Sequence, residues 1–405
     1  MRARLFAAVA SGLAMLACSP GATFAQSKYD VGANDHEIKV GNILAYSGPV
    51  SSLGIIGKIE AAYFKKVNDE GGINGRKIKF ISYDDAYSPP KTVEQARKLV
   101  ESDEVLFIFN PVGTPTNAAI QKYMNTKGVP QLFVGGGATR WNKPAEFPWT
   151  MGFQPNYQTE GRIFAKYILA TKPDAKIAVL YQNDDLGKDY LKGIKDGLGD
   201  RASLIVAEES YEISEPVIDS HVVKVKASGA DTFIAIALPR VAAQSIRKVS
   251  ELGWKPLFIL SSIGASIGTV IRPAGFDNSQ GIVSTVYLKD PSDPQWANDQ
   301  AKQKFDDFLA KYAPDADKND YFVVYAYVIS QTMVKVLQQC GNDLTRANVM
   351  RQAANLVDFR PDMLLPGIAI NTSATDFAPM KDMRTVRMQG DRWEIFGDIL
   401  SGSAP

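Results

Sequence analysis

The order of strand-like and helix-like segments constrains this chain more than any other feature. From residue 37 onward, runs rich in β-branched and aromatic residues alternate with amphipathic segments that end near glycine. Parallel strands need long crossover connections, and the helices in these connections cover both faces of the sheet. The order therefore predicts an α/β fold with a doubly wound parallel sheet. The first expected elements are strands at 37–44, 73–85, 105–109 and 130–134, and helices at 54–72, 89–102 and 116–128.

The same alternation starts again after residue 155, which predicts a second α/β lobe. At 405 residues the chain is also longer than one ordinary core, so two domains are expected. Three helical patterns follow after residue 293 and could cover either lobe. A hairpin is expected over 385–400, turning at Gly390 and Asp391. These later elements are expected as helices at 158–172, 186–199, 217–229, 240–253, 295–313, 320–340 and 345–357, and strands at 175–183, 203–211, 231–238 and 256–262.

Residues 1–25 have the pattern of a secretory signal peptide. Two arginines precede an apolar segment rich in Ala and Leu, and small residues predict cleavage before Gln26. Cys18 fits a lipoprotein signal poorly, because Leu16 stands where that signal prefers a small residue. We therefore expect an exported protein without a lipid anchor. Its one remaining cysteine, Cys340, allows no intrachain disulfide, so packed cores must hold the lobes together.

Composition and motifs argue against several classes of function. The 45 basic and 44 acidic residues nearly cancel, so neither nucleic acid nor an anionic membrane is an expected partner. With only His36 and His221, and little cysteine, the sequence lacks a nucleophile motif and a nitrogen or sulfur metal site. The adjacent Asp84 and Asp85 point to opposite faces of a strand, which favours loop capping over a metal site. We expect no enzymatic activity, no metal and no cofactor.

The residues that could bind a ligand lie in loops at the C-terminal ends of the expected strands, where open α/β sheets bind ligands. One loop, NPVGTPT, leads into a helix near Thr116. A helix N-terminus has unpaired N–H groups, so Thr114 beside it suits a carboxylate, although a plain N-cap fits as well. The loops mix hydroxyl groups, N–H groups and aromatic rings, which favours a small organic carboxylate. The candidate residues are Tyr46, Ser51, Ser52, Gly113, Thr114, Ala138, Thr139, Trp141, Asp185, Tyr211 and Glu215.

The most specific stretch of the sequence is NDEGGINGRKI. Together with IKVGNILAYSGPVSSLG, SPPKTVEQARKLVE and QNDDLGKDYLKGIKDGL, it resembles the type I periplasmic substrate-binding proteins of ABC transporters, in the leucine/isoleucine/valine-binding branch. The resemblance covers the whole chain after the signal peptide. It implies a periplasmic, monomeric protein of two α/β lobes joined by three crossover strands, which delivers its ligand to a membrane permease. The expected lobes are 26–154 with 284–365, and 155–283 with 366–405.

The resemblance also implies roles for individual residues. The family holds the ligand carboxylate with loop N–H groups and hydroxyl groups of the first lobe. In amino-acid-binding members, an acidic residue of the second lobe takes the ligand ammonium group, and Glu215 matches it by position. Pro216 departs from the usual pattern, however, and Glu215 fits a helix cap equally well. The residues that match the carboxylate-binding positions are Ser52, Gly113, Thr114, Ala138 and Thr139.

The expected ligand is therefore a branched-chain or other apolar amino acid. Relatives in this family that bind aromatic acids, aliphatic acids or amides leave a ligand without an amine as the alternative. A soluble ligand-sensing module for a signalling partner uses the same fold and is an alternative of another class. An exported hydrolase is a further alternative, against which the missing nucleophile motif argues.

Overall fold

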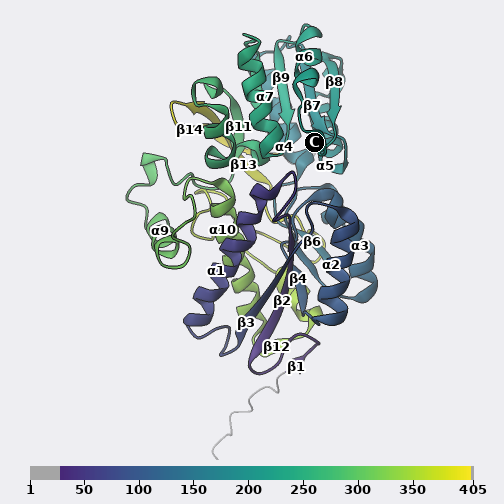
Figure 1. Cartoon of the computed structure of the whole chain (residues 1–405), viewed down its shortest axis with the longest axis vertical. Coiled ribbons are helices and arrows are strands. Elements are labelled where there is room, and N and C mark those ends of the chain that lie inside the picture. Colours follow the sequence, from purple (N-terminus) through teal and green to yellow (C-terminus); the bar gives the residue numbers. More distant parts are fainter. Residues whose placement is uncertain (1–27, 403–405) are drawn as a thin grey trace, which may run out of the picture.

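Two α/β lobes stand one above the other along the longest axis of the molecule, with the first lobe lower in Figure 1. The structure is a computed structural model that describes residues 28–402. The alternation of strands and helices that the sequence predicts is confirmed in both lobes. The expected signal peptide and Cys18 lie outside the described residues.

The first lobe is built on a five-stranded parallel sheet in the order β3-β2-β4-β5-β6. Its central strand β4 is fully buried, as its run of apolar residues predicts. Helices flank the sheet on both sides in Figure 1. Helix α3 starts at Thr114, two residues before the expected start. The elements are β2 (Glu37–Leu44), α1 (Ile55–Asp69), β3 (Lys77–Asp84), α2 (Pro89–Arg97), β4 (Phe107–Phe109), α3 (Thr114–Lys127), β5 (Gln131–Val134) and β6 (Thr150–Gly152).

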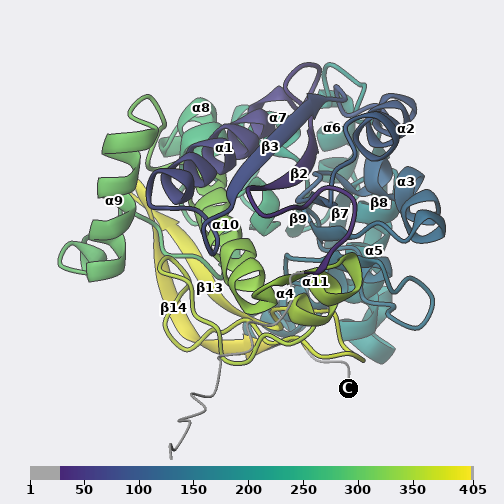
Figure 2. The same ribbon diagram turned by 90° about the horizontal axis from the view of Figure 1, so that it is seen from below.

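Three later helices complete the first lobe, which answers the question that the sequence left open. They are α9 (Gln300–Tyr312), α10 (Tyr321–Cys340) and α11 (Arg346–Ala353). Both α9 and α10 contact α1, and the Tyr63 ring of α1 lies 5.4 Å from the Tyr327 ring of α10. In Figure 2, α10 runs beside α1. The short strand β12 (Asp343–Leu344) pairs with β1 (Lys28–Tyr29) at the far end of the lobe.

The second lobe has a seven-stranded sheet in the order β14-β13-β11-β10-β9-β7-β8. Strands β7 to β11 are parallel, whereas β13 and β14 form the expected antiparallel hairpin at one edge, side by side in Figure 2. The elements are α4 (Tyr157–Thr171), β7 (Ile177–Gln182), α5 (Asp185–Leu198), β8 (Ile205–Tyr211), α6 (Asp219–Ala227), β9 (Thr232–Ile236), α7 (Pro239–Glu251), β10 (Leu257–Leu260), α8 (Arg272–Ala274), β11 (Val283–Val286), β13 (Asp382–Gln389) and β14 (Arg392–Ser401).

The chain passes between the lobes three times. The first passage follows β6, and the second follows β11, which pairs with β10 and β13 in the second sheet. The expected boundary at residue 284 falls within β11 (Val283–Val286). The third passage runs from α11 to β13, and its Leu364 forms a bridge with Leu288 of the second passage. These three segments are the covalent connections between the lobes.

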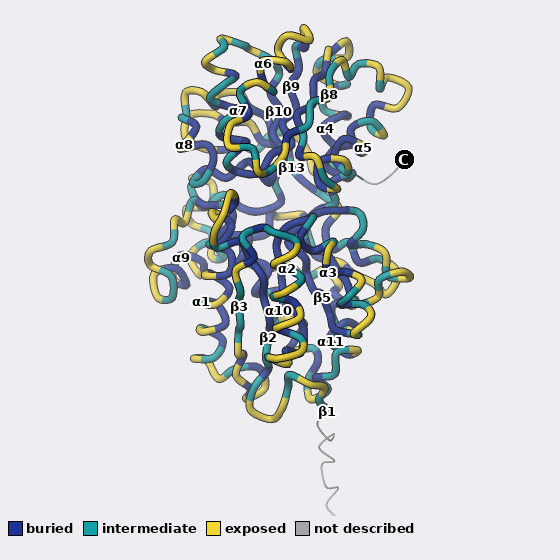
Figure 3. The backbone as a smooth tube through the Cα atoms, turned by 45° about the vertical axis from the view of Figure 1, so that its right-hand side comes forward, coloured by how far each residue is buried: buried dark blue, intermediate teal, exposed yellow. Residues whose placement is uncertain are grey.

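The interior of each lobe consists of buried strands, which Figure 3 shows in dark blue. Helix α10 is also buried over much of its surface, because it packs on α1 and α11. Within the described residues, no helix is both long enough and apolar enough to cross a bilayer. Cys340, at the end of α10, is a free and buried thiol.

Helices α4 and α5 approach each other closely at glycine residues. A Cβ atom on Gly193 would lie 2.3 Å from the carbonyl oxygen of Gln158. A Cβ atom on Gly161 would lie 2.6 Å from the carbonyl oxygen of Tyr190. Because both obstacles are backbone atoms, neither can rotate away. The packing of these two helices therefore depends on glycine at both positions.

Gly193→Ala is expected to lower the free energy of unfolding by about 1–3 kcal/mol, because an added methyl group in a tight contact forces the helices apart. Urea denaturation followed by circular dichroism measures the change. The matched control is Lys192→Ala on the exposed side of the same helix, expected to change the free energy by less than about 0.5 kcal/mol. Equal effects of the two substitutions would contradict the close-contact interpretation.

Candidate functional site

A pocket lies between the two lobes, at the C-terminal ends of the strands of both sheets. Loops of each lobe and the first turns of α10 form its walls. Its volume is about 30 Å³, so a ligand larger than a few atoms requires the lobes to part. The lining residues are Leu53, Ile56, Tyr87, Val112, Gly113, Thr114, Gly135, Gln154, Tyr157, Leu186, Leu238, Ile263, Phe322 and Tyr325.

Two hydroxyl groups of the first lobe belong to this lining and make no short hydrogen bond to another described residue, although Thr114 faces the Tyr157 hydroxyl and Tyr87 faces Gln182. They are the hydroxyl groups of Tyr87 and Thr114. Thr114 is fully buried and is the first residue of α3. Leaving a buried polar group unpaired is unfavourable, and a helix N-terminus favours an anion. The two hydroxyl groups can therefore donate hydrogen bonds to a carboxylate.

The loop between β4 and α3 holds Thr114 in a fixed position. Gly113 has φ +111°, and a Cβ atom there would lie 2.6 Å from the Tyr87 ring, so glycine is required. The Gly113 N–H donates to the Gly135 carbonyl at 3.1 Å. The Thr116 hydroxyl donates to the Val112 carbonyl at 3.0 Å. The N–H of Gly113 is thus used within the protein, which leaves the hydroxyl of Thr114 as the donor that this loop can offer to a ligand.

Tyr87 is positioned by Asp85, the second residue of the acidic pair at the end of β3. The carboxylate of Asp85 accepts hydrogen bonds from the Tyr87 N–H at 2.8 Å and from the Thr92 hydroxyl at 2.7 Å. Asp84 accepts from the N–H of Tyr46 at 2.8 Å. The two carboxylates therefore cap separate loops, which confirms the interpretation of the pair from the sequence.

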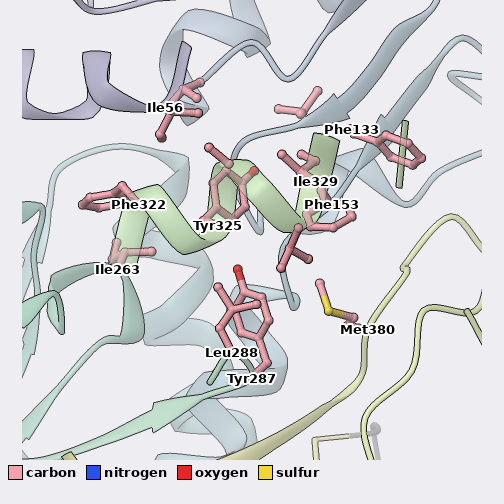
Figure 4. Close-up of a cluster of buried hydrophobic side chains, with 14 of the residues drawn as sticks. Ile56, Phe133, Phe153, Ile263, Tyr287, Leu288, Phe322, Tyr325, Ile329 and Met380 are labelled. Carbon is pink, nitrogen blue, oxygen red and sulfur yellow. The ribbon is translucent and has the colours of Figure 1, made fainter. Parts of the chain in front are cut away.

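Aromatic rings form much of the pocket wall. The Tyr157 ring stacks on Tyr190, with 4.6 Å between the ring centroids. Figure 4 shows Phe322 near Ile263 and Tyr325 on the next turn of α10. Burial raises the pKa of the Tyr157 and Tyr325 phenols, which keeps both of them neutral. The wall is thus mainly apolar, and phenol hydroxyl groups supply polar atoms in it.

In the first lobe, a buried glutamate supports this wall through hydrogen bonds on the side that faces away from the pocket. Glu60 on α1 accepts hydrogen bonds from the side-chain amides of Asn42 and Asn110. Asn110 in turn accepts a hydrogen bond from the Tyr325 hydroxyl at 2.8 Å. Burial raises the pKa of the Glu60 carboxyl group well above its ordinary value. Glu60 thereby ties α1 to α10 beneath the pocket.

Glu160 on α4 has the corresponding position in the second lobe. It accepts hydrogen bonds from the Tyr190 hydroxyl at 2.6 Å, the Ser262 N–H at 2.7 Å and the Thr285 hydroxyl at 2.7 Å. Burial again raises the pKa of this carboxyl group. Because Ser262 precedes the pocket residue Ile263, Glu160 fixes the turn that carries Ile263.

Of the first-lobe residues that the sequence singled out, Gly113 and Thr114 line the pocket. Tyr46 turns away, with its hydroxyl 2.6 Å from that of Ser82. Ser51 and Ser52 are exposed in the short turn before α1.

The next loop of the first lobe lies beside the pocket rather than in its lining. Ala138 and Trp141 line a small neighbouring cavity, and the Trp141 indole N–H has no partner among the described residues. The Thr139 N–H donates to Asp189 of α5 at 2.6 Å, and the Thr139 hydroxyl pairs with Asn156. Thr139 therefore connects the lobes instead of offering free donors.

Two second-lobe candidates also lie outside the pocket lining. Asp185 forms an ion pair of 2.7 Å with Arg140 of the first lobe, so it bridges the lobes. Tyr211 is buried at the end of β8, with its hydroxyl 3.4 Å from Gln182 and from the Ile236 carbonyl.

Glu215 pairs with a histidine of the second lobe. Its carboxylate lies 2.8 Å from the His221 ring and accepts a hydrogen bond from the Glu212 N–H at 2.7 Å. The expected helix cap is wrong, because the residue before α6 is Ile218 and no side chain caps that helix. Glu215 also does not line the interlobe pocket.

Sequence reasoning missed several pocket residues. Tyr87, Gln154, Tyr157, Phe322 and Tyr325 line the pocket but were not among the candidates. Tyr87 could have been found, because it follows the end of a strand by three residues, in the region where the other candidates were sought. Phe322 and Tyr325 could not, because they belong to a helical pattern that could cover either lobe.

Comparisons with known proteins agree with this geometry. Residues 37–392 match the family described as periplasmic binding protein. The chain is 26% identical over 309 residues to Leu/Ile/Val-binding protein homolog 1 of Brucella abortus (strain 2308), covering 76% of this chain and 80% of that protein. It is 26% identical over 307 residues to the leucine-specific-binding protein of Salmonella typhimurium, covering 70% of this chain and 82% of that protein.

Solved structures show the same fold. A branched chain amino acid ABC transporter protein from Thermus thermophilus with bound valine has a TM-score of 0.81 at 13% identity, over 91% of this chain and 97% of that one. The fatty acid ABC transporter substrate-binding protein from Thermomonospora curvata has a TM-score of 0.79 at 19% identity, over 93% of this chain and 95% of that one. The expected two-lobe fold of type I binding proteins is thereby confirmed.

His221 predicts a pH dependence of stability. Burial lowers its pKa, but hydrogen bonds to Glu215 and Glu209 outweigh this effect and raise the pKa overall. The folded state therefore binds the proton more tightly than the unfolded state. This stabilisation is complete below the ordinary histidine pKa of about 6.5 and is lost as the pH rises through the raised value.

His221→Gln should accordingly destabilise the protein more at pH 6 than at pH 9. Thermal unfolding at the two pH values measures the difference. His36→Gln, at an exposed histidine, is the control and should leave the shape of the pH profile unchanged. A deficit of His221→Gln that is the same at both pH values would exclude the proposed charge pairing.

Proposed function

Because this chain belongs to the periplasmic binding protein family and is of the Leu/Ile/Val-binding type, we propose that it captures a small apolar carboxylate between its lobes and delivers it to an ABC permease. The protein acts in the periplasm as a monomer and catalyses no reaction. The observation that carries the proposal is the interlobe pocket with the free hydroxyl groups of Tyr87 and Thr114.

The carboxylate of the ligand binds to the first lobe. The Thr114 hydroxyl and the positive end of α3 face the same pocket as the Tyr87 hydroxyl. Hydrogen bonds to a charged group are stronger than those between neutral groups, which favours a carboxylate at this position over a neutral acceptor. Ser52, Ala138 and Thr139, which the family resemblance adds, do not line this pocket, so the proposed carboxylate site depends on Thr114 and Tyr87.

The remainder of the ligand is apolar and has no ammonium group. The lining residues are aliphatic, aromatic or neutral polar, and none of them has a charged side chain. Glu215, the expected ammonium partner, is paired with His221 outside the pocket. An ammonium group would lose its hydration here without gaining a carboxylate partner. These observations support an aromatic or aliphatic acid over the amino acid that the sequence favoured.

Ligand binding is coupled to closure of the lobes. Residues of both lobes line the pocket, so a ligand makes all of its contacts in the closed form alone. The Arg140–Asp185 ion pair and the hydrogen bond from Thr139 to Asp189 also join the lobes. The closed form is the one that the permease then recognises.

A thermal-shift screen of the purified protein tests the ligand class. The set contains leucine-like amino acids, benzoate and cinnamate derivatives, and aliphatic mono- and dicarboxylates. A ligand at one hundred times its Kd stabilises the native state by about 2.7 kcal/mol, so it stands out from the set. We expect a shift with acids that lack an amine. A shift with amino acids alone would overturn this ligand class, and no shift with any carboxylate would overturn the function.

Removal of the free hydroxyl groups tests the site itself. Thr114→Val and Tyr87→Phe should each weaken binding of the identified acid by about tenfold to a hundredfold, because each removes a hydrogen bond to a charged group. Isothermal titration calorimetry measures the affinity. Glu215→Gln is the matched control and should leave the affinity unchanged. If both hydroxyl variants bind like the wild type, the carboxylate lies elsewhere.

A further inference from the structure

Gly136 lies where the interlobe pocket meets the small cavity beside it. Its neighbour Gly135 lines the interlobe pocket, Gly136 lines the small cavity, and Gln154 lines both. The volume of the small cavity is about 10 Å³, which is close to the room that one water molecule needs. The small cavity therefore has no room for a second ligand, but it can receive one atom of a ligand that is bound in the pocket.

Three hydrogen-bonding groups surround the open side of Gly136. A Cβ atom on this residue would lie 3.2 Å from the hydroxyl oxygen of Tyr157, 3.4 Å from that of Thr114 and 3.7 Å from the indole nitrogen of Trp141. Because glycine has no Cβ atom, this space stays free. The three distances leave room for a ligand oxygen atom within hydrogen-bond distance of these groups.

Two protons of this cluster are available to a ligand. The first is the indole N–H of Trp141, because this side chain is only 2% exposed and its nitrogen has no hydrogen-bond partner among the described residues. The hydroxyl groups of Thr114 and Tyr157 face each other, so one of their two protons can be used between them and the second is left over. Buried donors in folded proteins nearly always have an acceptor. The cluster therefore calls for an acceptor atom that takes two hydrogen bonds.

The surroundings favour an acceptor with negative charge. Helix α3 begins at Thr114, so the positive end of its dipole lies at the cluster. Among the residues that line the two cavities, none has a charged side chain. Burial raises the pKa of the Tyr157 phenol, so its hydroxyl group keeps its proton. A carboxylate oxygen accepts only, so it fits this cluster better than a hydroxyl group, which brings a donor of its own.

The backbone holds the donors of the cluster in place. The Tyr157 N–H donates to the Gly137 carbonyl at 2.8 Å, and the Trp141 N–H donates to the Ala138 carbonyl at 3.0 Å. The Trp141 side chain packs closely over Gly152, where a Cβ atom would lie 3.0 Å from that of Trp141. The indole N–H is thus oriented before a ligand arrives, which lowers the cost of ordering it on binding.

We propose that the space over Gly136 receives one carboxylate oxygen of the ligand and that the indole N–H of Trp141 donates a hydrogen bond to this oxygen. The absent side chain of Gly136 makes room for the oxygen, while the body of the ligand lies in the interlobe pocket. Gly136 and Trp141 thereby determine specificity for a carboxylate, in addition to Thr114 and Tyr87. This role rests on the proposed capture of a carboxylate.

Nuclear magnetic resonance of the isotope-labelled full-length protein tests the hydrogen bond directly. Each of the five tryptophans gives one indole N–H signal, and comparison with Trp141→Phe assigns the signal of Trp141. Benzoate and hexanoate are the probes. We expect the acid that binds to shift the Trp141 indole proton downfield, because a carboxylate acceptor deshields it. The indole signal of Trp149, which lines neither cavity, should stay in place.

The outcomes separate this role from the proposed function. If an acid raises the unfolding temperature of the protein but leaves the Trp141 indole signal in place, the role of Trp141 is overturned and the function stands. If no carboxylate raises the unfolding temperature, the proposed function fails and the role of Trp141 fails with it.

Two variants measure the contribution to affinity by isothermal titration calorimetry with the same acid. Trp141→Phe keeps an aromatic ring but removes the N–H, and it should weaken binding about tenfold. Gly136→Ala places a methyl group where the oxygen would lie, and it should weaken binding at least tenfold. The contacts of this methyl group are 3.2 Å or longer, so small shifts of the two hydroxyl groups accommodate it. Trp149→Phe is the matched control and should leave the affinity unchanged.

The primary amide of the same acid distinguishes a lost hydrogen bond from damage to the pocket. Trp141→Phe should weaken binding of the acid more than binding of the amide, because hydrogen bonds to charged groups are stronger than those between neutral groups. Equal losses for acid and amide would overturn the donor role, as would wild-type affinity in both variants. If Trp141→Phe does not fold, Gly136→Ala decides the question: wild-type affinity of this variant for the acid would exclude an oxygen atom over Gly136.

Discussion

Two buried glutamates, one in each lobe, hold the loops on which the interlobe pocket depends. Glu60 lies on α1 and Glu160 on α4, the first helix of the respective lobe, and both are almost completely buried. Each accepts hydrogen bonds from neutral groups, and movement of these donors would leave a buried carboxyl group unsatisfied. The pocket walls are thereby fixed to the interior of each lobe. Any motion of one lobe relative to the other therefore has to occur in the three passages that connect them.

The start of α10 links the two lobes and lines the pocket between them. Phe322 and Tyr325 line the interlobe pocket, whereas Tyr321 and Val324 of the same turn line a separate small cavity together with Trp296 and Trp393. Asp320 caps the helix by accepting from the Phe322 N–H at 2.9 Å, and it also accepts from the Ser266 hydroxyl of the second lobe at 3.0 Å. One helical turn thus has contacts with both lobes.

Features that depend on neighbouring residues could be predicted from the sequence, and features that depend on distant contacts could not. The strands, the helices and the loop with Thr114 follow from local hydrophobic periodicity and turn residues. The pocket role of Tyr325 depends on a contact with Asn110, which is 215 positions away. Glu215 matched a family position, but α6 brings His221 within its reach and gives the carboxylate another partner. Position along the chain cannot reveal such competition between partners.

The three passages between the lobes also determine when the protein can fold. The second sheet contains β13 and β14, which begin at residue 382, and the first lobe contains α10 and α11, which follow the second passage. Neither lobe is therefore complete until nearly the whole chain has been synthesised. Pairing between segments that are so far apart in sequence is intrinsically slow, because long loops must close before the contacts form. The emerging chain consequently leaves the edge strand β11 of the second sheet unpaired on one side until β13 and β14 are available.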